Sequence, residues 1–122
     1  MPDFQKKSIE VRYYSTSWGP HNFDFIDAIP LGTRIEGFNI RAFLGKYDKG
    51  DDLAAAIETT LELIDANMCI ALDYTTISTY FNCPTTVAYK SEDGVAHTII
   101  FELTLNNGAT HPFYFHQVVA YE

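Results

Sequence analysis

The chain has 122 residues, of which 47% are hydrophobic and 15% aromatic, and its 8 Lys and Arg oppose 16 Asp and Glu, giving a net charge of −8. This is a usual length for one domain, and the apolar and aromatic content excludes an intrinsically disordered chain. No apolar run approaches the roughly 20 residues that cross a bilayer, and the first ten residues lack the apolar segment of a signal peptide. We therefore expect a single compact domain over residues 1–122, located in the cytoplasm.

The charge is unevenly distributed along the chain. Residues 1–50 hold seven bases and six acids, whereas the remainder holds one base, Lys90, and ten acids, a net of −9. Nucleic-acid backbones and anionic membranes are bound through clustered Lys and Arg, which the second part lacks. The sequence therefore predicts neither direct nucleic-acid binding nor membrane binding.

The first half of the chain predicts extended structure. Apolar and polar residues alternate over 8–14, which predicts a strand, and a turn is expected at Trp18-Gly19-Pro20. Residues 22–29 are ambiguous between a strand and a short helix. Residues 33–44 are again expected to be extended, with a bulge at Gly37.

A helix is predicted over 52–66. Asp51 can cap its first amides, and Leu53, Ile57, Leu61 and Ile64 recur at spacings of four, four and three, which is the period of a core-facing helical stripe. Four stretches rich in β-branched and aromatic residues follow at 69–81, 85–90, 95–105 and 109–121. Turn signals at 93–94 and 107–108 separate the last three and favour an antiparallel meander.

These elements predict an α+β fold. One main helix would pack on a curled antiparallel sheet of about five or six strands. The arrangement resembles cystatin-like or NTF2-like architectures, and the resemblance is one of architecture alone.

Two histidines offer a candidate ligand site. A two-residue turn at 107–108 would place Phe101 opposite Tyr114 and make His97 and His116 diagonal neighbours on one face. Such imidazoles exchange protons near neutral pH or bind a metal, but a zinc site usually needs three or four ligands, and no third is apparent. We therefore predict no metal and no cofactor. A turn one residue longer or shorter would place the histidines on opposite faces, and a half-buried structural pair is the alternative interpretation.

Trp18 and His21 lie in a predicted loop, where binding residues are frequent, although such a Trp also serves to close the end of a core. The sequence contains neither the GxSxG motif of a serine nucleophile nor a GxGxxG or GxxxxGK[ST] phosphate-binding loop. Whether the protein is an enzyme is left open, with a non-catalytic role favoured.

Carboxylates form the clearest pattern. On the predicted helix, Asp51, Glu58, Glu62 and Asp65 would share one outward face without a basic partner in the helix. Like charges at this spacing cost about 0.2–0.5 kcal/mol per pair. A solvated face that keeps the protein soluble is one interpretation, and a surface that docks on a basic partner is the other.

Two functional hypotheses follow. The first is a small acidic binding protein without catalysis, which occupies a basic protein surface as an inhibitor or a DNA mimic does. The alternative is a small-molecule binding protein or enzyme whose pocket lies on the concave face of the sheet, with ligand-binding residues Trp18, His21, His97, Tyr114 and His116. Either is compatible with a homodimer formed through the long strand at 109–121.

Overall fold

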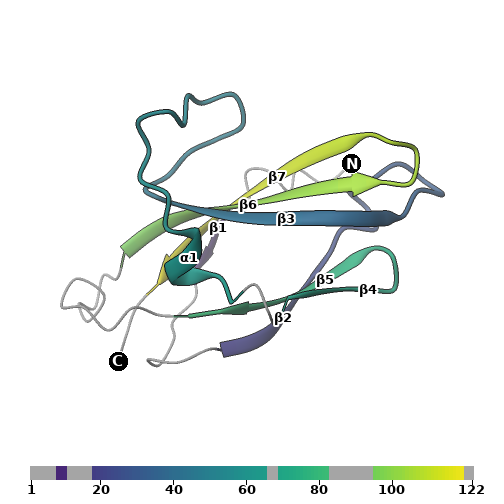
Figure 1. Cartoon of the computed structure of the whole chain (residues 1–122), viewed down its shortest axis with the longest axis horizontal. Coiled ribbons are helices and arrows are strands. Elements are labelled where there is room, and N and C mark those ends of the chain that lie inside the picture. Colours follow the sequence, from purple (N-terminus) through teal and green to yellow (C-terminus); the bar gives the residue numbers. More distant parts are fainter. Residues whose placement is uncertain (1–7, 11–17, 66–68, 83–94, 120–122) are drawn as a thin grey trace.

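The computed structural model describes residues 8–10, 18–65, 69–82 and 95–119, and this part of the chain is mostly β-structure. Its elements, in chain order, are β1 (Ser8–Glu10), β2 (Trp18–Asp24), β3 (Ile35–Leu44), α1 (Thr60–Leu63), β4 (Ile70–Leu72), β5 (Thr76–Phe81), β6 (Val95–Leu105) and β7 (Thr110–Val119). The strands form two sheets, a first sheet of order β1-β7-β6-β3 and a second of order β2-β5-β4. Figure 1 shows one sheet above the other, with α1 beside them at one end.

The expected α+β fold with one main helix is wrong. α1 has four residues, and most of the segment 52–66 is not helical. The reason is that this segment pairs with the edge of β3: the Leu44 amide donates to the Ile57 carbonyl oxygen, and the Thr59 amide donates to that of Ala42, both at 2.8 Å. Backbone groups satisfied by a neighbouring strand need no helix, so tertiary pairing overrides the local pattern.

The apolar stripe of the expected helix is split between core and solvent. Ile64 is buried at 5% exposure, whereas Leu61 is 96% exposed and Ile57 62% exposed. In the described part of the chain, α1 included, no helix is long and apolar enough to span a membrane.

Residues 69–81, expected to be one strand, form a hairpin of β4 and β5. Asp73 and Tyr74 turn the chain with φ of 50° and 65°, the left-handed region that tight turns require. The Tyr74 carbonyl oxygen then accepts a hydrogen bond from the Ile35 amide at 2.6 Å, which joins the second sheet to the start of β3.

The hairpin of β6 and β7 exists, but its expected register is wrong by one residue. The Gly108 amide donates to the Leu105 carbonyl oxygen and the Leu105 amide to that of Ala109, both at 2.9 Å, and Gly108 has a φ of 85°. This is a three-residue loop ending in a left-handed glycine rather than a two-residue turn. As a result Phe101 lies opposite Phe113, and Tyr114 belongs to the other face of the sheet.

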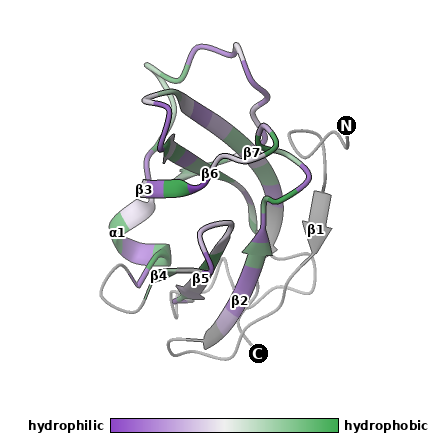
Figure 2. Cartoon of the chain, turned by 90° about the vertical axis from the view of Figure 1, so that its right-hand side faces the viewer, coloured by the Kyte–Doolittle hydropathy of each residue, from purple (hydrophilic) through white to green (hydrophobic). Residues whose placement is uncertain are grey.

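The core lies between the two sheets and is built from phenylalanine rings. Phe101 is fully buried; its ring centroid lies 4.7 Å from that of Phe23 in β2 and 5.5 Å from that of Phe115 in β7. In Figure 2 the first sheet curves over the second across this core. We call this side of the first sheet the inner face.

The opposite, outer face of the first sheet carries a second, smaller apolar cluster. Phe43, Ile100 and Tyr114 are buried there against Tyr47 and Leu53 of the loop 45–57. Figure 1 shows this loop, which follows β3, extending over the first sheet. The loop therefore covers apolar surface that would otherwise face solvent.

The remaining sequence expectations have mixed outcomes. The strand over 33–44 is confirmed for Ile35–Leu44, and the register of β3 with β6 shifts between Ile35 and Gly37, next to the expected bulge position. The strand over 8–14 is confirmed for Ser8–Glu10, which pairs with β7 in parallel. The turn at Trp18-Gly19-Pro20 is wrong, because these residues begin β2. The expected strand at 85–90 and the turn at 93–94 lie outside the described residues.

Candidate functional site

The four acidic residues expected on one helical face lie in different local structures. Asp51 belongs to the loop 45–57, where its carboxylate accepts a hydrogen bond from the Asp48 amide at 2.7 Å. Glu58 forms an isolated bridge with Phe43 of β3, Glu62 lies in α1, and Asp65 follows α1. The common helical face is therefore wrong, although Glu58, Glu62 and Asp65 remain close along the chain.

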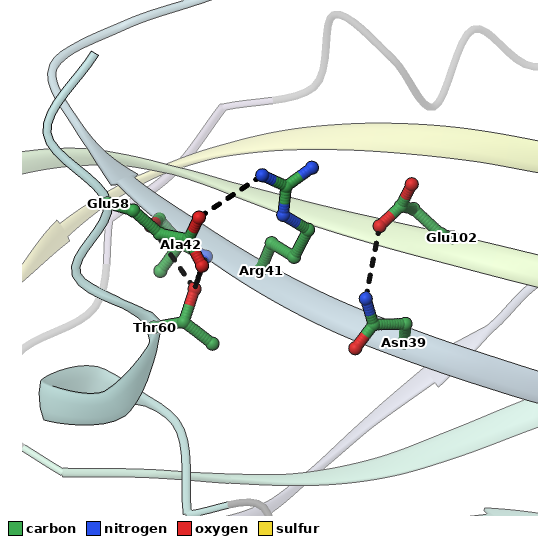
Figure 3. Close-up of polar contacts among 6 residues, drawn as sticks. All are labelled: Asn39, Arg41, Ala42, Glu58, Thr60 and Glu102. Carbon is green, nitrogen blue, oxygen red and sulfur yellow. Dashed lines mark hydrogen bonds and ion pairs between the residues drawn. The ribbon is translucent and has the colours of Figure 1, made fainter. Parts of the chain in front are cut away.

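Glu58 is held by the groups around it. Its Oε1 lies 3.1 Å from an Arg41 Nη2, and its Oε2 accepts a hydrogen bond of 2.9 Å from the Thr60 hydroxyl (Figure 3). The Thr60 hydroxyl and then Arg41 hold the pKa of the Glu58 carboxyl below its ordinary value. The Arg41 guanidinium also lies 4.8 Å from the centre of the Phe43 ring. The base that neutralises Glu58 is therefore fixed in place.

Around α1 the structure exposes both acidic and apolar side chains. We define the α1 surface as Ile57, Glu58, Leu61 and Glu62, all of them exposed. A cavity of about 280 Å³ is lined by Glu58, Thr59, Thr60, Leu61 and Glu62. Thr59 is buried, and its Oγ1 has no hydrogen-bond partner among the described residues.

A second cavity, of about 230 Å³, lies beside β3. It is lined by Phe38, Asn39 and Ile40 of that strand and by Ile64 and Cys69. The Cys69 thiol donates to the Asp65 carbonyl oxygen at 3.3 Å. Burial raises the pKa of this thiol, and the negative charge of Asp65 adds to the effect. Cys69 is therefore a protonated, half-buried side chain and a poor nucleophile.

The two histidines of the alternative hypothesis are not brought together. His97 lies opposite Gln117 and His116 opposite Thr98, so the two side chains project from opposite faces of the first sheet. His97 is fully buried on the inner face, where its Nδ1 donates to the Val95 carbonyl oxygen at 3.1 Å and burial lowers its pKa.

His116 serves the outer face instead. Its Nε2 donates to the Tyr47 carbonyl oxygen at 2.8 Å and lies 3.5 Å from an Asp48 carboxylate oxygen. Tyr114 lies on the same face, almost completely buried under the loop 45–57. His116 and Tyr114 thus hold a loop in the described structure.

Trp18 and His21 belong to the second sheet rather than to a loop. Trp18 lies opposite Phe81 in the β2–β5 ladder, and the His21 ring is tilted against the Phe81 ring with centroids 5.6 Å apart. Burial lowers the pKa of His21. The residues expected to form one ligand pocket are therefore distributed over both sheets.

Sequence reasoning missed the two features that the structure brings together near α1, namely the exposed Leu61 and the free edge of β3. One signal was present: Thr59 and Thr60, two adjacent β-branched residues in the middle of the expected helix, favour extended pairing. The free edge of β3 has no signal of its own, because strand order is not visible in a single sequence.

No protein-family model matches the chain, and no curated protein matches its sequence. Within residues 8–10, 18–65, 69–82 and 95–119, no group of three or more His, Cys, Asp and Glu side chains is placed to hold a metal ion.

Proposed function

We propose that this is a non-catalytic binding protein that docks the α1 surface on a basic protein partner, as an inhibitor or a DNA mimic does. The observation that carries the proposal is the exposed Leu61 side chain, which lies between two exposed carboxylates along the chain and lines a cavity with both of them. Exposed apolar surface bordered by polar groups marks protein–protein contacts more often than a single apolar side chain does, and Ile57, next to Glu58 in the chain, is exposed as well.

The chemistry of this surface suits a lysine or arginine side chain. Such a side chain has an apolar stem, which Leu61 and Ile57 can contact, and a cationic head, which Glu62 can bind. The adjoining cavity is smaller than the roughly 300–1,000 Å³ typical of small-molecule sites. The Thr59 hydroxyl, which has no hydrogen-bond partner among the described residues, supplies an additional polar group beside it.

The charge of the whole chain supports the same partner. A net charge of −8 attracts a basic protein over long range and accelerates the encounter, most strongly at low salt. Among the described residues, Glu58 forms an ion pair with Arg41. The alternative, a small-molecule site on His97 and His116, has no comparable observation in its favour.

The test uses a basic probe peptide, acetyl-Lys-Leu-Lys-Val-Lys-amide, titrated calorimetrically at low and at physiological ionic strength. The double variant Glu58→Gln/Glu62→Gln changes the α1 surface. The control variant Asp24→Asn/Asp27→Asn removes the same charge from two exposed carboxylates at the end of β2. The Asp24 carboxylate accepts a hydrogen bond from the Ile26 amide, and the side-chain amide that replaces it retains an oxygen for that bond.

We expect the first variant to bind the probe about tenfold more weakly and the second to bind almost as tightly as the original chain. Salt should weaken the binding of the original chain. Equal losses in both variants would show that only the bulk charge matters, and binding insensitive to salt or to Glu58→Gln/Glu62→Gln would refute the proposal.

A further inference from the structure

β3 is the last strand of the first sheet, so one of its edges has no neighbouring strand in that sheet. Other parts of the chain form hydrogen bonds with the two ends of this edge. At one end the Ile35 amide donates to the Tyr74 carbonyl oxygen at 2.6 Å. At the other end the Ala42 amide donates to the Thr60 hydroxyl at 2.9 Å, and the Ala42 carbonyl oxygen accepts a hydrogen bond from the Thr59 amide. Among the described residues, these contacts leave the middle of the edge without a backbone partner.

The backbone groups of that open middle point away from the sheet. Both the amide and the carbonyl of Ala42 are used on the side away from β6, and this direction repeats every second residue along an antiparallel strand. The amides and carbonyls of Ile40 and Phe38 therefore point the same way. No hydrogen bond from another described residue reaches them on this side, so they form a template for one more strand.

The cavity beside this edge gives the template a pocket. Phe38, Asn39 and Ile40 line it from β3, and Ile64 and Cys69 line it from the chain around α1. Its volume of about 230 Å³ is below the usual range for a small-molecule site, and Phe38, Ile40 and Ile64 give it apolar walls beside polar groups. If another strand were added to this edge, a side chain on the inner-face side of that strand would enter the cavity.

The charges around the edge select a basic segment. Glu36 is exposed at the start of β3, Glu62 is exposed on α1, and Asp65 is close enough to Cys69 to raise the pKa of its thiol. Arg41, on the same strand, already pairs with Glu58, and Arg34, just before the strand, lies over the Tyr74 ring. A second copy of this chain, with the same net charge of −8, would be repelled from the same edge.

We propose that the edge of β3 at Phe38 and Ile40 binds an extended, basic segment of the partner polypeptide as an added antiparallel strand, with one apolar side chain in the adjoining cavity. This deepens the proposed function and rests on it for the charge of the partner. The α1 surface would then hold basic side chains of the same partner next to the strand.

The test uses two isomers of the probe peptide acetyl-Lys-Leu-Lys-Val-Lys-amide that carry the same charge. One is N-methylated at its Leu and Val, and the other at two of its lysines. In an antiparallel addition, residues that share the inner face with Phe38 and Ile40 are those whose amides face β3. Methylation at Leu and Val therefore removes pairing hydrogen bonds, and methylation at lysine does not.

We expect the isomer methylated at Leu and Val to bind about tenfold more weakly than the unmethylated probe, and the isomer methylated at lysine to bind as the probe does. In the original chain, the probe should also slow the hydrogen exchange of the Phe38 and Ile40 amides, measured by NMR. Equal binding of the two isomers, or unchanged exchange at both amides, would overturn the inference.

The two proposals fail in distinguishable ways. If the difference between the isomers persists while Glu58→Gln/Glu62→Gln leaves the affinity unchanged, the added strand stands and the docking role of the α1 surface falls. If both isomers bind alike but Glu58→Gln/Glu62→Gln weakens their binding, the docking role of the α1 surface stands and the added strand falls. Protection of Phe38 and Ile40 without peptide, accompanied by dimers in sedimentation, would assign the edge to a second copy and overturn the proposed occupant.

Discussion

Neighbouring residues of β6 lie in two different environments. Ile99 is fully buried on the inner face, among phenylalanine side chains of both sheets, whereas Ile100 is buried on the outer face beneath the loop 45–57. The inner face is closed by strands whose own hydrogen bonds fix them. The outer face is closed by a loop that Thr98 and His116 hold through a few polar contacts. We therefore expect packing on the inner face to contribute more to the free energy of unfolding. Packing on the outer face should depend on how firmly the loop 45–57 is attached.

The same substitution at the two neighbours gives the sharpest test of that difference. Ile99→Ala leaves a cavity between two sheets that cannot approach each other freely, whereas the loop over Ile100→Ala can settle into the space. We expect each truncation to lower the free energy of unfolding by about 2–5 kcal/mol, with Ile99→Ala near the top of this range and Ile100→Ala near the bottom. Urea denaturation of both variants measures the free energy of unfolding, and equal losses would contradict the comparison.

Thr98→Val tests how the loop is attached. The Thr98 hydroxyl accepts a hydrogen bond from the Tyr47 amide at 2.8 Å and donates one to the Gly45 carbonyl oxygen at 2.9 Å. Removing it leaves two backbone groups without their partner, so we expect a loss of about 1–3 kcal/mol and faster hydrogen exchange in the loop.

Thr104→Val is the matched control for Thr98→Val, because Thr104 lies on the same face of the same strand and is exposed. It should change neither the free energy of unfolding nor the exchange of the loop amides. If the two variants behave alike, the loop does not depend on Thr98.

A smaller, pH-dependent effect is expected from His97, which is fully buried on the inner face. Burial holds the pKa of His97 below its ordinary value of 6.5, so the unfolded chain takes up a proton more readily than the folded chain as the pH falls below 6.5. Folding stability should therefore decline in this range. His97→Gln should flatten the decline, measured as the free energy of unfolding against pH.

His111→Gln is the control for this pH dependence, since the His111 side chain is only partly buried. The burial of His21 lowers its pKa as well, so part of the decline should remain in His97→Gln. A decline that steepens in His97→Gln, or that vanishes in His111→Gln, would contradict the assignment.

The strands were predictable where their side-chain pattern alone decides the structure. Residues 95–105 and 110–119 are rich in β-branched and aromatic residues that alternate between faces, and Gly37 pointed to the bulge, which the structure places between Ile35 and Gly37. The hairpin register was not predictable from Asn107-Gly108, because the same residues fit a two-residue and a three-residue loop. That single residue decides whether His97 and His116 meet.

The helix failed for a different reason. The spacing of Leu53, Ile57, Leu61 and Ile64 does match a helical stripe, but the pattern does not reveal that the edge of β3 offers hydrogen bonds to residues 57–59. For the site, Glu58 and Glu62 were identified from charge alone. Their relation to Leu61, Thr59 and the edge of β3 depends on that non-local pairing, so it could not be read from the sequence.

The parallel pairing of β1 with β7 constrains the order in which the protein folds. Ser8 lies opposite His116, so the two strands come from distant parts of the chain, whereas β6 and β7 meet through a short hairpin loop. Closing a long loop costs more entropy than closing a short one, and non-local contacts slow folding. We expect the β6–β7 hairpin to form early and β1 to join late. During synthesis β1 leaves the ribosome before β7, so this pairing must wait until β7 has followed.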